Sequence, residues 1–221
     1  MKITKTKYKE IFCAENQKRK LATVNSIPGF APFNEKLITK GKIEYRTWDP
    51  YKSKWAAALM KKIKEFPIKK DSKVLYLGAA SGQSASYIAD VAENGKIFCV
   101  EISSRVLRDL IFVSEKKKNM IPILGDAKNP EEYNFIGEID VILQDVAVKN
   151  QVDVLIKNKK FLKKNGYVMI AIKSRSVDVS ANPEKIFKDS EEKLKNYFEI
   201  IDKKRLEPFE KDHIVFLLRK I

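Results

Sequence analysis

Residues 73–84, KVLYLGAASGQS, decide the fold of this chain. Residues 74–77 are a short apolar run of the kind that a buried parallel strand shows. Gly78 and Gly82 bracket a loop of small residues, and residues 84–91 are predicted to form the helix that follows. Small side chains let the backbone approach a ligand closely, and the amides at a helix N-terminus attract electron-rich groups. Strand, loop and helix together indicate the first turn of a nucleotide-binding type of α/β fold.

The spacing within this loop argues against NAD as the ligand. A G-x-G-x-x-G fingerprint that started at Gly78 would need a glycine in place of Ala80 and a glycine or alanine in place of Gln83. A glycine turn that merely joins two elements is the other interpretation of the same residues. The rest of the chain has to decide between a binding loop and a simple turn.

Length and composition fit one α/β domain with a small appendage. The chain has 221 residues, of which 44% are apolar, and this is enough for a proper core. No apolar run approaches the length of a membrane span, and residues 1–13 lack the apolar stretch of a signal peptide. Two cysteines and one histidine make neither a disulfide framework nor a zinc site. We therefore expect a cytoplasmic protein without a membrane partner or a metal.

The charge balance predicts a polyanionic partner. Lysine and arginine total 44 against 29 acidic residues, which gives a formal net charge of +15. Growth at high temperature enriches lysine and glutamate together, so it does not explain the imbalance between the signs. The basic residues are scattered along the chain, and nucleic acid is the leading partner for such a surface.

Two regions are expected. Residues 1–45 contain strand-like pieces at 8–14, 21–24 and 35–38 with turns between them, which predicts a small antiparallel β domain. Residues 46–221 form the larger domain. It opens with Asp49 as a helix N-cap and Pro50 as the first residue of a helix that runs to about residue 66. Lys54 lies in this helix, and a solvated side chain is the ordinary interpretation of a helical lysine.

Polar or charged residues stand at the carboxyl ends of successive predicted strands. Apolar strands at 74–77, 96–100, 121–124, 139–143 and 167–172 alternate with helices at 84–91, 103–118 and 150–164, which predicts a parallel sheet with helices on both faces. The strand ends carry Glu101, Asp126, Asp145 and Lys173, next to the Gly78 loop. Ligands of open α/β sheets bind in the crevice at this edge, and an acidic residue about 20 residues past the loop typically accepts hydrogen bonds from ribose hydroxyls.

The C-terminal part departs from this alternation. A helix at 184–197 is followed by strands at 198–202 and 214–218 with no helix between them, so the last strand is expected to run antiparallel to the others. His213 immediately precedes this strand, which places it at the same edge of the sheet. A lone histidine is more often structural than catalytic.

Six strings in order resemble one family. The predicted sheet, the GAASG loop and the acidic end of the second strand together resemble the class I S-adenosylmethionine-dependent methyltransferases. The fold that this resemblance implies is a doubly wound, mostly parallel seven-stranded sheet with an antiparallel last strand. The strings YRTWDPYKSKWAAAL, KVLYLGAASGQS, IPILGDA, DVILQDVA, IAIKS and EPFEKDH together resemble the fibrillarin family, the methyltransferases of box C/D ribonucleoproteins. The match runs from about Glu35 to the C-terminus. The glycine- and arginine-rich N-terminal extension of eukaryotic members is absent, so the chain is similar to the compact archaeal form.

The resemblance implies methyl transfer from S-adenosylmethionine to a ribose 2′-hydroxyl of RNA, with residues 46–221 as the methyltransferase domain. It carries a catalytic set onto Lys54, Asp145, Lys173 and His213. It carries cofactor contacts onto Gly78, Ala79, Ala80, Gly82, Gln83, Ser84, Glu101, Ile102, Asp126, Ala127, Asp145 and Val148. The chain departs from the family where paired threonines are replaced by Gln83 and Ser84, and where Val148 replaces a common glutamine.

A role for each catalytic residue follows as a hypothesis. Lys173 and Asp145 would hold the 2′-hydroxyl and Lys173 would take its proton, because an aspartate is a poor base for an alcohol. Lys54 and His213 would orient that pair or hold the flanking phosphate. The departures from the family pattern at Gln83, Ser84 and Val148 would change cofactor contacts or affinity.

The resemblance also implies partners: a box C/D guide RNA and its target RNA (rRNA or tRNA), a Nop-domain scaffold protein, and a kink-turn-binding, ribosomal-protein-like subunit. Two other functions stay open. A methyltransferase that acts on a base nitrogen or a protein side chain often carries Asn/Asp-Pro-Pro-Tyr after the fourth strand, where this chain has DVAVKN. A non-catalytic RNA-binding subunit is disfavoured by the intact set of four catalytic candidates.

Overall fold

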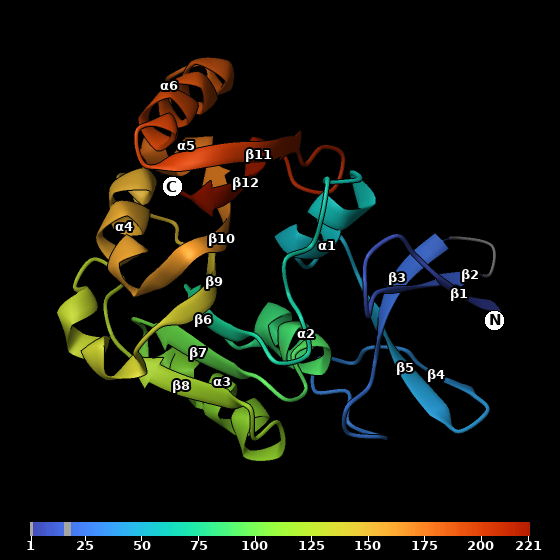
Figure 1. Ribbon diagram of the computed structural model, residues 1–221. Coiled ribbons are helices and arrows are strands. Elements are labelled where there is room, and N and C mark those ends of the chain that lie inside the picture. Colours follow the sequence, from blue (N-terminus) through green and yellow to red (C-terminus); the bar gives the residue numbers. More distant parts are fainter. Residues whose placement is uncertain (1, 16–18) are drawn as a thin grey trace.

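Seven apolar stretches pair into one sheet with the strand order β11-β12-β10-β9-β6-β7-β8 (Figure 1). The computed structural model describes residues 2–15 and 19–221. The strands are β6 (Lys73–Leu77), β7 (Lys96–Glu101), β8 (Met120–Leu124), β9 (Ile139–Gln144), β10 (Leu162–Lys173), β11 (Phe198–Arg205) and β12 (His213–Lys220). Strands β6 to β10 pair in parallel, whereas β12 is antiparallel to both β10 and β11. The predicted doubly wound, mostly parallel sheet with an antiparallel last strand is confirmed.

Alternate side chains of each strand face two separate layers of helices, as the period of two in a buried strand requires. Val74 and Tyr76 pack in the core beneath one layer, and Leu75 and Leu77 pack in the core beneath the other. The first layer holds α1 (Lys54–Met60), α2 (Gln83–Val91) and α3 (Ser104–Lys116). The second holds the 3-10 helix η1 (Pro130–Ile136), α4 (Gln151–Asn158), η2 (Lys159–Phe161) and α6 (Pro183–Lys195), with the short α5 (Ser174–Val177) beside α6.

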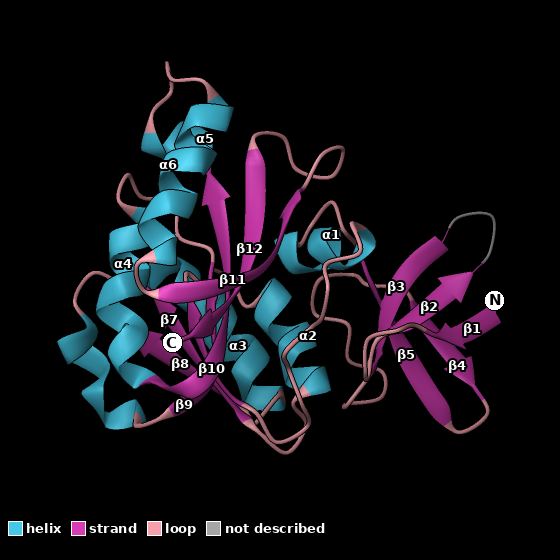
Figure 2. Cartoon of the chain, turned by 45° about the horizontal axis from the view of Figure 1, so that its top comes forward, coloured by secondary structure: helices cyan, strands magenta, loops and turns pink. Residues whose placement is uncertain are grey.

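The predicted N-terminal β region is a five-stranded antiparallel sheet with the order β1-β2-β3-β5-β4. Its strands are β1 (Lys2–Lys5), β2 (Phe12–Glu15), β3 (Arg19–Val24), β4 (Leu37–Lys40) and β5 (Ile43–Trp48). The sheet stands on the α1 and α2 side of the larger sheet (Figure 2). Strands β1 and β5 were not predicted, and the domain division at residue 45 stays a prediction.

The predicted helix from Pro50 to residue 66 is wrong in length, because α1 contains only Lys54–Met60. Asp49 does not cap this helix: its carboxylate accepts a hydrogen bond from the Tyr51 amide at 2.9 Å and closes a turn instead. At the other end, Lys62 adopts a left-handed φ of 58° and terminates the helix.

The predicted helix at 150–164 is also too long, because α4 ends at Asn158 and β10 already begins at Leu162. Asn165 and Gly166 lie inside this strand, where its register with β9 shifts, and Asn165 adopts a left-handed φ of 59°. Asn-Gly is typically a turn dipeptide, but here it marks an irregularity within a strand and does not end a helix. The helices η1 and α5 were not predicted.

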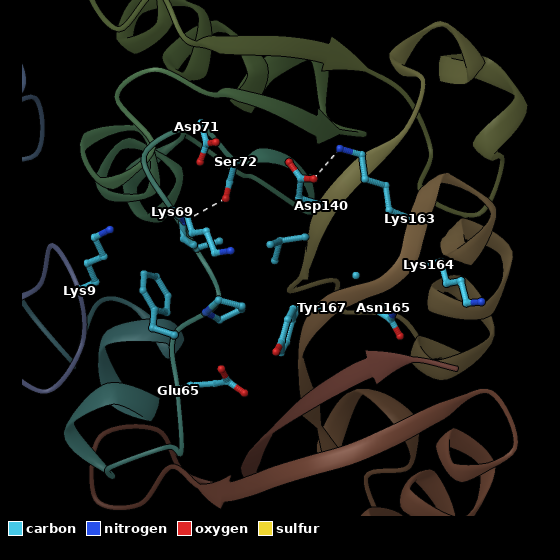
Figure 3. Close-up of a pocket in the computed structure, with 15 residues that line it drawn as sticks. Lys9, Glu65, Lys69, Asp71, Ser72, Asp140, Lys163, Lys164, Asn165 and Tyr167 are labelled. Atoms are coloured by element: carbon cyan, nitrogen blue, oxygen red, sulfur yellow. Dashed lines mark hydrogen bonds and ion pairs between the residues drawn. The ribbon is translucent and has the colours of Figure 1, made fainter.

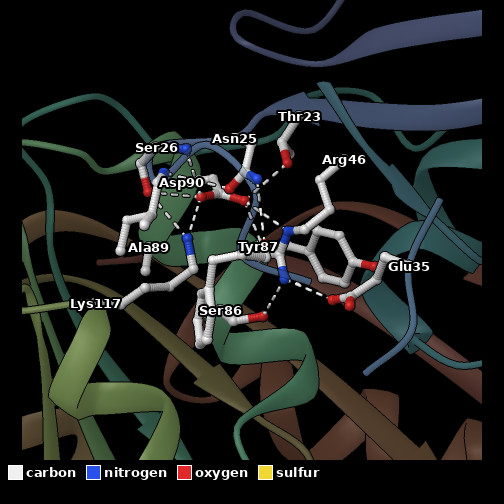
Figure 4. Close-up of polar contacts among 12 residues, drawn as sticks. Thr23, Asn25, Ser26, Glu35, Arg46, Ser86, Tyr87, Ala89, Asp90 and Lys117 are labelled. Carbon is white, nitrogen blue, oxygen red and sulfur yellow. Dashed lines mark hydrogen bonds and ion pairs between the residues drawn. The ribbon is translucent and has the colours of Figure 1, made fainter. Parts of the chain in front are cut away.

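A buried ionic cluster joins the two sheets (Figure 4). We call Glu35, Arg46, Asp90 and Lys117 the junction cluster; their side chains are buried and carry two positive and two negative charges. Arg46 of β5 donates to the Asp90 carboxylate of α2 at 2.7 Å and to Glu35 at 2.6 Å. Lys117, which follows α3, pairs with the other oxygen of Asp90. Each buried charge therefore faces an opposite one.

Neutral groups complete the shell of Asp90. The Thr23 hydroxyl donates at 3.0 Å, and the amide and hydroxyl of Ser26 donate at 3.1 Å and 2.7 Å. Burial alone would raise the pKa of Asp90, but Arg46 and Lys117 outweigh it and hold that pKa below its ordinary value. Burial lowers the pKa of Lys117, against the attraction of Asp90. The N-terminal sheet is thus fastened to α2, the helix that follows the glycine loop.

Candidate active site

The carboxyl ends of β6, β7, β8 and β9 surround a cavity of about 320 Å³. It is lined by Gly78, Ala80, Val100, Glu101, Ile102, Gly125, Asp126, Ala127, Lys128, Asp145, Val146, Ala147, Val148 and Val154. Eight of the predicted cofactor residues are in this lining: Gly78, Ala80, Glu101, Ile102, Asp126, Ala127, Asp145 and Val148. The other four, Ala79, Gly82, Gln83 and Ser84, belong to the same loop and to the first turn of α2. The structure therefore brings the predicted set together at one edge.

The glycine loop needs its glycines for conformation and for space. Gly78 has a φ of 78°, and a Cβ placed on it would stand 2.5 Å from the carbonyl oxygen of Asp145. Gly82 has a φ of 86°, and a Cβ there would stand 2.7 Å from Leu110. Both φ angles are in the left-handed region, which residues other than glycine rarely adopt. The loop is a built feature of the site and not only a connection between two elements.

Glu101 is fixed by two backbone amides. One oxygen of its carboxylate accepts from the Ala80 amide and the other from the Ser103 amide, each at 2.9 Å. Each carboxylate oxygen can accept a further hydrogen bond, and Glu101 lines the cavity, which suits the two hydroxyls of a ribose. Beside it Ile102 is 65% exposed, a large apolar surface at the rim. Carboxylate and apolar rim together fit a nucleoside.

Asp145 connects this cavity to a second group of residues. Its carboxylate pairs with the ammonium of Lys54 at 2.9 Å, and both side chains are about a quarter exposed, at 26% and 21%. The Asp145 amide donates to the carbonyl of Leu77 at 2.9 Å, which ties the end of β9 to the end of β6. A partly exposed ion pair at the mouth of a cleft can be reached by a substrate.

Lys173 and His213 are direct cross-strand neighbours at the start of the β10–β12 pairing. The main chain of Lys173 is held by the Gln151 side chain, which donates to its carbonyl at 3.1 Å and accepts from its amide at 3.0 Å. The Lys173 side chain is exposed and has no carboxylate within ion-pair distance among the described residues. Its ammonium is therefore available to a ligand.

His213 is 5% exposed, and its Nδ1 lies 2.6 Å from the carbonyl oxygen of Lys211. A carbonyl only accepts, so Nδ1 carries the proton and, in the neutral ring, Nε2 is the acceptor. Among residues 2–15 and 19–221, no group of three His, Cys, Asp or Glu side chains is arranged to hold a metal ion.

Within the catalytic set, the ion pair joins Asp145 to Lys54, while Lys173, at the end of the adjacent strand, has no carboxylate partner in the described part of the chain. The roles assigned to these residues stay predictions. Two supporting residues were missed, Gln144 and Gln151. Gln144 is fully buried and donates to the carbonyl of Gln151 at 2.7 Å. A glutamine inside the apolar run DVILQD was the available signal, since a buried polar side chain needs a partner.

A larger cavity, of about 540 Å³, lies at the opposite edge, where β6, β9 and β10 begin (Figure 3). The carboxylate of Asp140 accepts from Lys163 at 2.7 Å and from the Lys73 amide at 2.8 Å. On the same side, the Ser72 hydroxyl accepts from the Lys69 amide at 2.9 Å. None of the predicted site residues lines this cavity, and these contacts hold strand beginnings in place.

Comparisons with known proteins agree with this geometry. The Fibrillarin family model matches residues 3–220. The fibrillarin-like rRNA/tRNA 2′-O-methyltransferase of Thermococcus onnurineus is 48% identical over 225 residues and covers 100% of both chains. Aeropyrum pernix fibrillarin, solved in complex with natively bound S-adenosyl-L-methionine, is 36% identical with a TM-score of 0.91, over 99% of this chain and 98% of that one.

A fibrillarin in complex with Nop5p is 34% identical with a TM-score of 0.89, over 98% of this chain and 100% of that one. In the described part of this chain, no helix has the length and apolar character needed to cross a membrane. The family model and the relatives extend over nearly the whole sequence, including the N-terminal sheet. The chain belongs to the fibrillarin family.

Proposed function

We propose that this chain transfers a methyl group from S-adenosylmethionine to a ribose 2′-hydroxyl of RNA. One observation carries the proposal: Asp145 lines the cofactor cavity and pairs with Lys54 at 2.9 Å, next to the strand end that bears Lys173. A single carboxylate thus borders both the donor and the acceptor. The family membership and the relative from Thermococcus onnurineus, named for this reaction, support it.

The cavity residues fit S-adenosylmethionine, which supplies an electrophilic methyl group on a sulfonium when it is bound. Glu101 would accept from the ribose hydroxyls, and Ile102, Ala127 and Val148 would border the adenine. The glycine loop would leave room for the methionine part, because its small residues allow close approach of the backbone. Asp126 would face the polar edge of the base.

The reaction is an in-line displacement, in which the carbon–sulfur bond breaks as the carbon–oxygen bond forms. Holding the 2′-oxygen in line can supply about 7–11 kcal/mol of the barrier. Asp145 accepts a hydrogen bond from the hydroxyl while Lys54 keeps its carboxylate in place. The hydroxyl proton passes to the amine of Lys173, whose exposed side chain has no carboxylate within ion-pair distance among the described residues. His213 stands next to it with Nε2 as an acceptor.

We propose that partners select the RNA nucleotide that is methylated. A scattered basic surface binds the RNA backbone and does not distinguish between bases. We therefore place the chain in a box C/D ribonucleoprotein, where a guide RNA pairs with the target and where a Nop-domain scaffold and a kink-turn-binding, ribosomal-protein-like subunit hold the enzyme over it. The complex of a fibrillarin with Nop5p supports the scaffold, and the charge of +15 supports RNA. We propose the cytoplasm as the compartment, because rRNA and tRNA act there.

The test is methyl transfer to a guide-paired RNA, with and without the partner proteins, on a target with a 2′-hydroxyl and on its 2′-deoxy version. We expect methylation of the first target only, and only in the complete particle. Nucleoside digestion and mass spectrometry separate ribose from base methylation. A methylated base, or equal labelling of the deoxy target, would refute the proposal. A lack of S-adenosylmethionine binding in calorimetry, together with no methylation, would instead favour a non-catalytic RNA-binding subunit.

A further inference from the structure

The first turn of α1 carries Lys54 and begins at an unusual cap. Ser53 is the N-cap residue and has the extended backbone that this position requires, with φ −152° and ψ 119°. A serine in this place normally accepts a hydrogen bond from an amide of its own helix, which stabilises the helix by roughly 1 kcal/mol. Here the side chain makes no such bond.

The partner that Ser53 contacts instead is Ser84, in the first turn of α2. The two hydroxyl oxygens are 2.9 Å apart. Ser53 is 3% exposed, so this contact is not a chance meeting of two surface side chains. The hydroxyl that would stabilise one helix therefore connects it to the first turn of α2, which directly follows the glycine loop.

A second anchor lies on the other side of Lys54. The indole Nε1 of Trp55 donates to the hydroxyl of Tyr76 at 2.8 Å, and both side chains are buried. Burial raises the pKa of Tyr76 far above its ordinary value and the Asp145 carboxylate adds to the rise, while Trp55 and Ser84 oppose it. The Tyr76 hydroxyl therefore stays protonated, and it lies near Trp55, Ser84 and Asp145.

Lys54 itself gains nothing from its place in the helix. It is the first residue of α1, where the positive end of the helix dipole opposes a positive charge. Its side chain is held instead by Asp145, across 91 positions of sequence. Such a pair keeps its geometry only if the backbone on both sides of the lysine is fixed, and the two anchors provide that.

We infer that Ser53 and Tyr76 are positioning residues for Lys54, and that the Ser53–Ser84 bridge and the Tyr76–Trp55 bond align its ammonium with Asp145. The inference rests on the proposed function. It adds that the cofactor loop and the lysine form one unit, so that the first turn of α2 sets where the acceptor oxygen is held.

The experiment uses the complete particle with Ser53→Ala and Tyr76→Phe. We expect the rate of methyl transfer at saturating cofactor to fall by about tenfold for each, since a small misplacement in an aligned site costs one to two orders of magnitude. Cofactor affinity, measured by calorimetry, should stay within about twofold of the wild type. Ser53→Thr keeps the hydroxyl and should restore the rate.

The matched control is Ser72→Ala, which removes a buried hydroxyl at the other end of β6. It should cost stability by thermal unfolding without changing the rate. If Ser53→Ala and Ser72→Ala have the same rate and differ only in melting temperature, the positioning role is refuted. A parallel fall of cofactor affinity and rate would also refute it, since the residues would then belong to cofactor binding.

A double-mutant cycle makes the assignment specific. In a Lys54→Ala background, assayed with enzyme in excess over RNA, Ser53→Ala should add less than about a twofold loss, because the group it positions is gone. A further tenfold loss would overturn the inference. If the Lys54→Ala rate is below detection, rescue by Ser53→Thr decides, and failed rescue overturns it. A wild-type particle that does not methylate the 2′-hydroxyl would instead refute the proposed function.

Discussion

Asp90 is the centre of the junction cluster, and its replacement offers the clearest test of how the two sheets hold together. The carboxylate accepts hydrogen bonds from Arg46 and Lys117 and from the neutral groups of Thr23 and Ser26. Asp90→Asn keeps the shape and removes the charge. Glu35 then remains as the counter-charge for two buried cations, so one positive charge is left uncompensated.

Removing one partner of a buried ion pair destabilises a protein by about 3–5 kcal/mol. For a chain of this size, about 4 kcal/mol corresponds to a fall of about 8–16 °C in melting temperature. Unfolding in urea, followed by the fluorescence of the buried Trp48 and Trp55, measures the free energy directly. The two tryptophans lie on the N-terminal sheet and on α1, so one transition is expected if the regions unfold together.

The compensating variant separates charge from packing. Adding Lys117→Met to Asp90→Asn removes the uncompensated cation, and a neutral replacement of a buried pair is often close to the wild type in stability. We expect the double variant to be more stable than Asp90→Asn alone. A loss below about 1 kcal/mol for Asp90→Asn, or a double variant less stable than the single one, would refute the reasoning.

Four further predictions concern the site and the pH dependence. Lys173→Ala should abolish turnover and leave the cofactor affinity, measured by calorimetry, nearly unchanged. The control Lys164→Ala, at the far end of the same strand, should leave both turnover and affinity unchanged. Turnover of Lys173→Ala within a few-fold of wild type would contradict the proposed role of Lys173. Glu101→Gln should weaken S-adenosylmethionine binding by about tenfold or more in the same calorimetric assay, because a hydrogen bond to a charged group is worth about 1.5–3 kcal/mol. Gly78→Ala should lower both stability and rate, since its Cβ would stand 2.5 Å from the Asp145 oxygen and its φ is 78°; a crystal structure that shows Asp145 in its original place would argue against this. Burial alone would raise the pKa of Asp140, but the hydrogen bonds from Lys163 and the Lys73 amide outweigh burial and lower that pKa. The stabilisation that Asp140 contributes is therefore complete above a pH of about 4, and it is lost as the pH falls through the lower pKa of the folded state. Stability measured between about pH 4 and pH 2 should therefore fall less steeply for Asp140→Asn than for the wild type.

The sheet could be predicted from local signals. Apolar strands, the Gly78 loop and polar strand ends each leave a pattern within a few residues, and parallel strands necessarily bring their carboxyl ends to one edge. This is why Glu101, Asp126 and Asp145 were placed correctly around one cavity. Helix lengths were less predictable. Asp49 and Pro50 match the sequence pattern of a helix N-terminus, but the Asp49 carboxylate closes a turn instead.

The interactions between distant residues left no pattern in the sequence. Lys54 and Asp145 are 91 positions apart, and Arg46 and Asp90 are 44 apart. No local pattern shows that Lys54 pairs with Asp145 or Arg46 with Asp90, and only the packing of the fold brings each pair together. The same holds for Ser53, which is the N-cap residue of α1 where Asp49 was predicted, and whose hydroxyl contacts Ser84.

The missing side chain of Gly78 also bears on the proposed reaction. A Cβ there would meet the carbonyl oxygen of Asp145, so the loop that would border the methyl donor packs directly against the residue proposed to hold the acceptor. Under the proposed function, we therefore expect the spacing between donor and acceptor to be set within this chain, and the partners to supply the RNA strand.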